Sequence, residues 1–139
     1  MKRIILTGML LALAAVVWSC AASDPQAQKL ARGKYLVENV GMCADCHTRR
    51  NDKGELDKTH WLQGSELDIM PTALMPWANA APMIAGLPSL NEKDAVNFLE
   101  TGALPGGRQL RPPMPAFRFS HEDAEAVVTY LKSLNTKHG

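Results

Sequence analysis

The sequence predicts an all-α domain in which a few helices are joined by long loops. Three observations support this prediction: apolar residues recur at helical spacing in three segments, no segment alternates as a strand does, and two stretches rich in proline and glycine have no periodicity. The length of 139 residues suits one domain. A 46% apolar composition and a net charge of +1 exclude a disordered chain and argue against a nucleic-acid partner.

Residues 1–19 have the pattern of a secretory signal peptide. Two basic residues come first, and the apolar run from Ile4 to Trp18 is short for a bilayer core of about 30 Å, although a membrane anchor is the alternative. The segment Val17-Trp18-Ser19-Cys20 resembles a bacterial lipobox, in which the cysteine carries lipid. Trp18 departs from that pattern, because the position two before the cysteine is normally small or aliphatic. Ordinary cleavage near residues 21–22 would instead discard Cys20. Either cleavage removes the two basic residues and changes the formal net charge from +1 to −1.

Residues 20–28 are assigned to a short tether and residues 29–139 to the folded domain, because the tether is rich in Ala, Ser, Pro and Gln. The first helix is expected from Gln26 to Val40 and ends at Gly41. Small or apolar residues form its buried face: Ala27, Leu30, Gly33, Val37 and Val40. Because Gly33 has no side chain, another helix could approach closely at that point.

Two further helices are predicted from their end signals. Asn91 or Ser89 would cap a helix of about ten residues that ends at Gly102. Ser120 would cap the last helix, whose first turn is acidic, as suits the positive end of its dipole. The buried face of this last helix is expected to comprise Ala124, Val127, Val128, Leu131 and Leu134.

Residues 51–85 and 104–119 are expected to be irregular, with one short helical turn in the first of them. Loops of this length are uncommon in a small domain. They become plausible if they wrap a large cofactor that supplies part of the core.

The segment Cys43-Ala44-Asp45-Cys46-His47 identifies such a cofactor, because CxxCH is the attachment signature of c-type haem. Each cysteine would form a thioether with one vinyl group, and His47 would then bind the iron. A zinc site would need further paired ligands, and a redox dithiol would need a βαβ pattern. The sequence shows neither, and its single motif predicts one haem.

Met114 is the expected sixth ligand of the iron. It lies in a loop with three prolines, which restrict the backbone and would hold a ligand rigidly, and a thioether ligand raises the potential. His121 and His60 are the alternatives. Met75 and Met83 are expected to line the apolar crevice instead.

The chain resembles a class I cytochrome c from about Gln28 to Leu134, on the CxxCH motif, the proline loop with Met114 and the terminal helix. It is similar to bacterial periplasmic monohaem cytochromes in four short segments: Gly33-Lys34-Tyr35-Leu36, Trp61-Leu62-Gln63-Gly64, Met75-Pro76-Trp77-Ala78 and Pro112-Pro113-Met114-Pro115. The resemblance implies a cytochrome c-like fold around one covalent haem c. It also implies that the first and last helices cross at right angles, with Gly33 and Tyr35 near Tyr130 and Leu131.

The expected function is electron transfer rather than catalysis. The resemblance implies an exported protein of a bacterial periplasmic respiratory chain, which accepts single electrons from a dehydrogenase and passes them to another redox protein. The alternative is a haem-based enzyme or gas sensor with an open or displaceable sixth position.

Several residues near the expected haem have more than one interpretation. Trp61 and Trp77 either donate to a haem propionate or pack in the crevice. Arg108, Arg111 and Arg118 either steer an acidic partner, neutralise the propionates or belong to a solvated loop.

Overall fold

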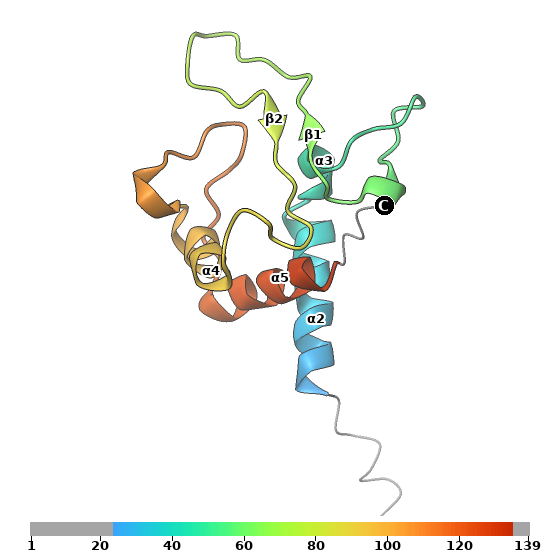
Figure 1. Ribbon diagram of the computed structural model, residues 1–139, viewed down its shortest axis with the longest axis vertical. Coiled ribbons are helices and arrows are strands. Elements are labelled where there is room, and N and C mark those ends of the chain that lie inside the picture. Colours follow the sequence, from blue (N-terminus) through green and yellow to red (C-terminus); the bar gives the residue numbers. More distant parts are fainter. Residues whose placement is uncertain (1–23, 135–139) are drawn as a thin grey trace, which may run out of the picture.

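The computed structural model describes residues 24–134. Three helices form its base: α2 (Pro25–Tyr35), α4 (Glu92–Thr101) and α5 (His121–Ser133). Helix α5 runs across α2 and packs beside α4, and the long irregular segments lie on one side of this base (Figure 1). The all-α prediction is confirmed. No helix within residues 24–134 has both the length and the apolar character needed to cross a bilayer.

Helix α2 begins where Asp24 accepts a hydrogen bond from the backbone N–H of Gln26. The helix continues into one π-helical turn at Leu36–Val40 and ends at Gly41, as predicted. The predicted buried face is only partly right, because α5 crosses only the later part of α2 (Figure 1). Gly33 and Val37 are buried there, whereas three members of that face are exposed, namely Ala27, Leu30 and Val40.

The crossing of α2 and α5 is built around Gly33. A Cβ atom at this position would lie 1.9 Å from the carbonyl oxygen of Ala126 and 2.9 Å from Cβ of Tyr130. The expected close approach at Gly33 is therefore confirmed. Tyr35 is half-exposed and its ring lies beneath the guanidinium of Arg32, so it contributes little to the buried contact.

The predicted ends of α4 and α5 are confirmed. Asn91 accepts from the N–H of Asp94, and Gly102 ends α4 with a left-handed φ of 76°. Ser120 accepts from the N–H of Asp123 at the start of α5. The predicted face of α5 is buried except for Leu134, which is half-buried, and two further residues join it: Ala126 and Tyr130.

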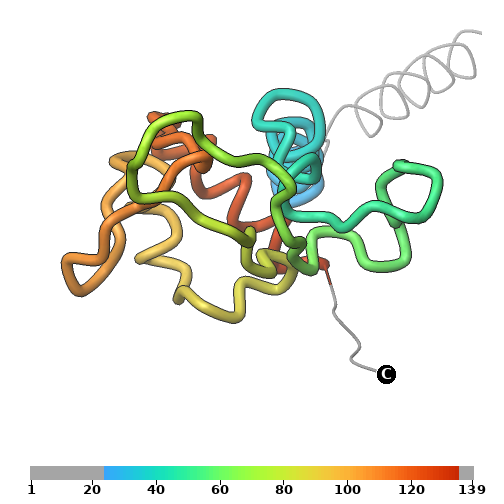
Figure 2. The backbone as a smooth tube through the Cα atoms, turned by 90° about the horizontal axis from the view of Figure 1, so that it is seen from above, coloured from blue at the N-terminus to red at the C-terminus, as the bar shows by residue number. Residues whose placement is uncertain are grey.

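The irregular segments contain several short helices and strands. They are α3 (Ala44–His47), two 3-10 turns (Lys58–His60 and Pro105–Gly107), and the antiparallel strands β1 (Ser65–Glu66) and β2 (Ala80–Ala81). The sequence has no strand signal of useful length, and this one pair of two-residue strands is too short to show alternation. Seen from above in Figure 2, the segments drawn green, yellow and orange curve around one region beside α5.

Candidate cofactor site

The irregular segments enclose one side of a cavity of about 330 Å³, within the range of cofactor pockets, about 300–1,000 Å³. Its walls come from α3, α4, α5 and the loops before and after α4, and most of the lining side chains are apolar. Cys43, Cys46, His47 and Met114 all line it. The fold therefore brings Met114 to the same cavity as the CxxCH motif.

The two motif cysteines belong to the turn of α3. Cys43 is the N-cap of α3, and Cys46 lies one turn later. Both are free thiols and partly buried, and burial raises the pKa of Cys43 to about 11. The arrangement presents two thiols, rather than a disulfide, at the cavity wall.

His47 is held in the tautomer that a metal ligand requires. His47 is 5% exposed, and its Nδ1 lies 2.6 Å from the carbonyl oxygen of Pro82. Because a carbonyl can only accept, Nδ1 carries the proton and Nε2 keeps its lone pair. Burial lowers the pKa of His47, which favours this neutral form, although the hydrogen bond to Pro82 opposes the shift.

A buried hydrogen-bond path supports the position of Pro82. Thr48 is 1% exposed, and its Oγ1 accepts from the N–H of Leu62 at 2.9 Å. The carbonyl of Leu62 accepts two backbone N–H groups from the residues just after Met83, both at 3.0 Å. Thr48 thus fixes the segment that holds His47. No sequence pattern indicates this role, since it depends on contacts between distant segments.

Replacing Thr48 by valine should lower the free energy of unfolding by about 1–3 kcal/mol, because the buried N–H of Leu62 loses its acceptor. Denaturant titration of the haem-loaded protein measures this. Thr129→Val is the matched control. The Thr129 hydroxyl donates to a carbonyl within α5, so its loss leaves no backbone N–H without an acceptor. Equal stability losses in the two variants would contradict this role of Thr48.

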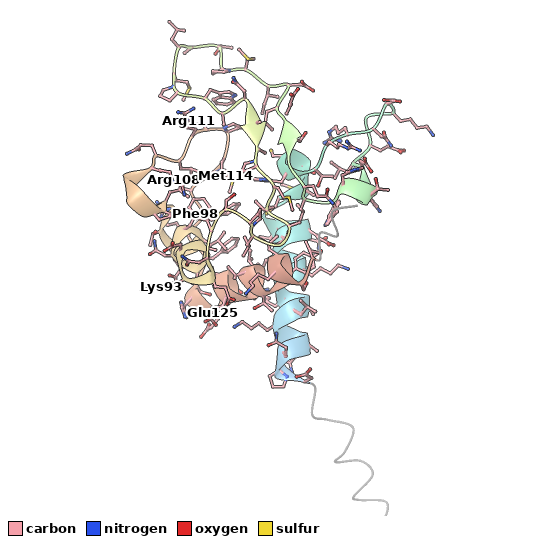
Figure 3. All side chains as sticks on the ribbon, in the orientation of Figure 1. Lys93, Phe98, Arg108, Arg111, Met114 and Glu125 are labelled. Carbon is pink, nitrogen blue, oxygen red and sulfur yellow. The ribbon has the colours of Figure 1, made fainter. Side chains whose placement is uncertain are left out.

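Met114 reaches the cavity from the loop between α4 and α5. The carbonyl of Pro112 accepts from the N–H of Ala78 at 2.8 Å, which ties this loop to the segment before β2. After Met114 in the chain, the guanidinium of Arg118 donates to the carbonyl of Phe117 at 2.7 Å. Figure 3 shows Met114 in the region above α5, between α3 and α4.

The two histidines considered as alternative ligands lie away from the cavity. Nδ1 of His60 is 2.8 Å from the carboxylate of Asp57, and Nδ1 of His121 is 2.8 Å from that of Glu100. Neither histidine lines the cavity. Across residues 24–134, no group of three His, Cys, Asp or Glu side chains is placed to bind a metal ion.

Other expected crevice residues divide into two sets. Met83 lines the cavity as predicted, whereas Met75 is half-exposed and does not, so that prediction is wrong. Neither Trp61 nor Trp77 lines it. The indole N–H of Trp77 donates to the carbonyl of Ile69 at 2.9 Å instead, which closes the exposed loop between these two residues.

Comparisons with known proteins agree with this geometry. The profile of the family described as cytochrome c matches residues 30–135. A diheme cytochrome c-type protein of Cereibacter sphaeroides is 30% identical over 143 residues, which cover 94% of this chain and 43% of that protein. The fructose dehydrogenase cytochrome subunit of Gluconobacter japonicus is 31% identical, over 76% of this chain and 22% of the subunit. The gluconate 2-dehydrogenase cytochrome c subunit of Pantoea cypripedii is 34% identical, over 84% of this chain and 29% of that subunit.

The chain belongs to the cytochrome c family, whose members carry electrons on covalently bound haem c. It spans less than half the length of each of these three relatives.

Proposed function

We propose that this chain is a monohaem cytochrome that carries single electrons, with haem c bound through Cys43 and Cys46 and with His47 and Met114 as iron ligands. The observation that carries the proposal is that one apolar cavity is lined by all four side chains. When bound, the haem supplies a one-electron Fe(III)/Fe(II) couple.

Each part of the site has a defined task in this proposal. The Pro82 carbonyl directs the Nε2 lone pair of His47 toward the cavity. The apolar lining excludes water, and the thioether of Met114 favours reduced iron. With His47 and Met114 both bound to the iron, the site would have no open position for a substrate. This distinguishes the carrier from a haem enzyme or gas sensor.

A dehydrogenase is the proposed source of the electrons, and another redox protein their acceptor. The support is that the relatives from Gluconobacter and Pantoea are cytochrome subunits of dehydrogenases. We place the chain in the periplasm, with residues 1–19 as signal peptide, 20–28 as tether and 29–139 as the cytochrome domain. Cys20 lies outside the described residues and is proposed to carry the lipid.

The lipid proposal has its own test. Growth with labelled palmitate should label the wild-type chain and leave Cys20→Ser unlabelled. An unlabelled wild-type product would show that Cys20 is removed or unmodified.

Covalent haem attachment is tested by replacing the motif cysteines. In a denaturing gel stained for haem, the wild-type chain should retain haem, with one iron per chain by elemental analysis. Cys43→Ala/Cys46→Ala should lose all covalent haem, because no thioether can form. Cys20→Ser is the matched control and should retain it. Haem retained by the double variant would contradict the proposed site.

A further inference from the structure

The loop between β1 and β2 presents large apolar side chains to solvent. Residues 69–77, here called the apolar loop, contain no ionisable side chain. Leu74 is fully exposed, Met70 is 80% exposed, and Ile69 and Met75 are about half-exposed. Covering such side chains is favourable, so a group of them on the surface of a small domain marks an interaction site.

The apolar loop is held in a defined shape. The indole N–H of Trp77 donates to the carbonyl of Ile69 at 2.9 Å and joins the two ends of the loop. Just outside these ends, the N–H of Leu67 donates to the carbonyl of Asn79 at 2.8 Å, and β1 pairs with β2. Two prolines restrict the backbone between them. A loop that is ordered before binding loses little conformational entropy when a partner covers it.

The base of the apolar loop belongs to the wall of the cofactor cavity. Leu67 and Ala78, which flank the loop on its two sides, both line the cavity, as Met114 does. The N–H of Ala78 also donates to the carbonyl of Pro112 at 2.8 Å, which joins the apolar loop to the loop that carries Met114. A protein that covers the apolar loop would therefore lie at the rim of the proposed haem site, where electrons could pass over a short distance.

The position of the loop favours a protein over a membrane as its partner. The apolar loop and the start of α2 lie at opposite ends of the molecule (Figure 1). Cys20, which is proposed to carry the lipid, precedes Asp24 by four positions, and these span at most about 14 Å. The lipid would hold the start of α2 near the bilayer and direct the apolar loop away from it.

We propose that the apolar loop is the docking surface for a redox protein that exchanges electrons with the haem and presents an apolar surface of its own. The inference rests on the proposed function and states where the partner binds. Because the loop carries no charge, its contribution to binding should not depend on ionic strength. Steering of an acidic partner by arginines would instead weaken as salt is added.

The first part of the test identifies the partner in the native host. A photoreactive amino acid replaces Leu74 in the full chain, and in the control it replaces Lys53, which is exposed in a different loop. Irradiation should join the Leu74 position, but not the Lys53 position, to a protein with a redox cofactor. Mass spectrometry identifies that protein.

The second part measures electron exchange between that purified protein and the haem-loaded chain by stopped-flow absorbance. Met70→Ser/Leu74→Ser should lower the second-order rate constant by about tenfold or more at low and high ionic strength, because two apolar contacts are lost. The midpoint potential should not change. Leu30→Ser is the matched control, since Leu30 is an exposed leucine of α2 that does not line the cavity, and it should keep the wild-type rate.

Several outcomes would overturn the proposal. A crosslink from the Leu74 position to a second copy of the chain or to lipid would give the apolar loop a different partner, and no crosslink would leave it without one. An unchanged rate in Met70→Ser/Leu74→Ser, or an equal loss in Leu30→Ser, would also contradict it. A haem-stained denaturing gel and the sulfur-to-iron charge-transfer band are examined first, so that loss of the haem or of its ligand is recognised as failure of the proposed function instead.

Discussion

Replacing Met114 by alanine is expected to abolish the sulfur-to-iron charge-transfer band of the oxidised protein and to lower its midpoint potential. The thioether is the group that favours reduced iron, and Met114 reaches the cavity from a loop fixed at Pro112. We expect a fall on the order of 0.1 V, a fraction of the roughly 0.8 V range that axial ligands span. The variant should also bind carbon monoxide rapidly, because its sixth position is open.

Met83→Ala is the matched control for the ligand. Met83 lines the same cavity, but it directly follows Pro82, whose carbonyl holds His47. This variant should keep the charge-transfer band and differ only modestly in potential. A band that survives in Met114→Ala and disappears in Met83→Ala would reverse the assignment.

Gly33→Ala is expected to destabilise the protein by about 3 kcal/mol, the upper end of typical overpacking costs. The added Cβ would lie 1.9 Å from a backbone oxygen of α5, so the two helices must move apart. The direction of the change in unfolding free energy is informative, because alanine at an ordinary helical position stabilises a helix by about 1 kcal/mol relative to glycine. Denaturant unfolding of the holoprotein measures the difference.

Lys34→Ala provides the control for that substitution. Lys34 is the next residue of α2 and is exposed, so its replacement should leave the free energy of unfolding nearly unchanged. A Gly33→Ala variant as stable as wild type would mean that the two helices do not approach closely at this position.

The helices were predictable wherever their signals are local. Asn91, Gly102 and Ser120 act within a few residues of their own position, so the sequence indicates the ends of α4 and α5 correctly. The buried face of the first helix was predicted less well. Periodicity shows which side of α2 is apolar, but Leu30 is exposed because α5 reaches only the later turns, a matter of tertiary arrangement.

The candidate site likewise contains residues with a local sequence signal and residues whose role depends on tertiary contacts. Cys43, Cys46 and His47 form one contiguous motif and are found from the sequence directly. Met114 was predicted from its place in a proline-rich loop, whose prolines indicate a rigid backbone but do not indicate what the loop faces. The support of His47 through Thr48 and Leu62 cannot be recognised in the sequence, because it consists of one side-chain and two backbone hydrogen bonds between distant segments.

The most direct test of the account is the mass of the tryptic peptide that contains the motif. Cleavage after Lys34 and Arg49 releases residues 35–49, which include both motif cysteines. The account predicts that this peptide carries the added mass of one haem, bound through both sulfur atoms, with no free thiol. A haem-free peptide with two alkylatable thiols, recovered from the protein as purified from its native host, would contradict it.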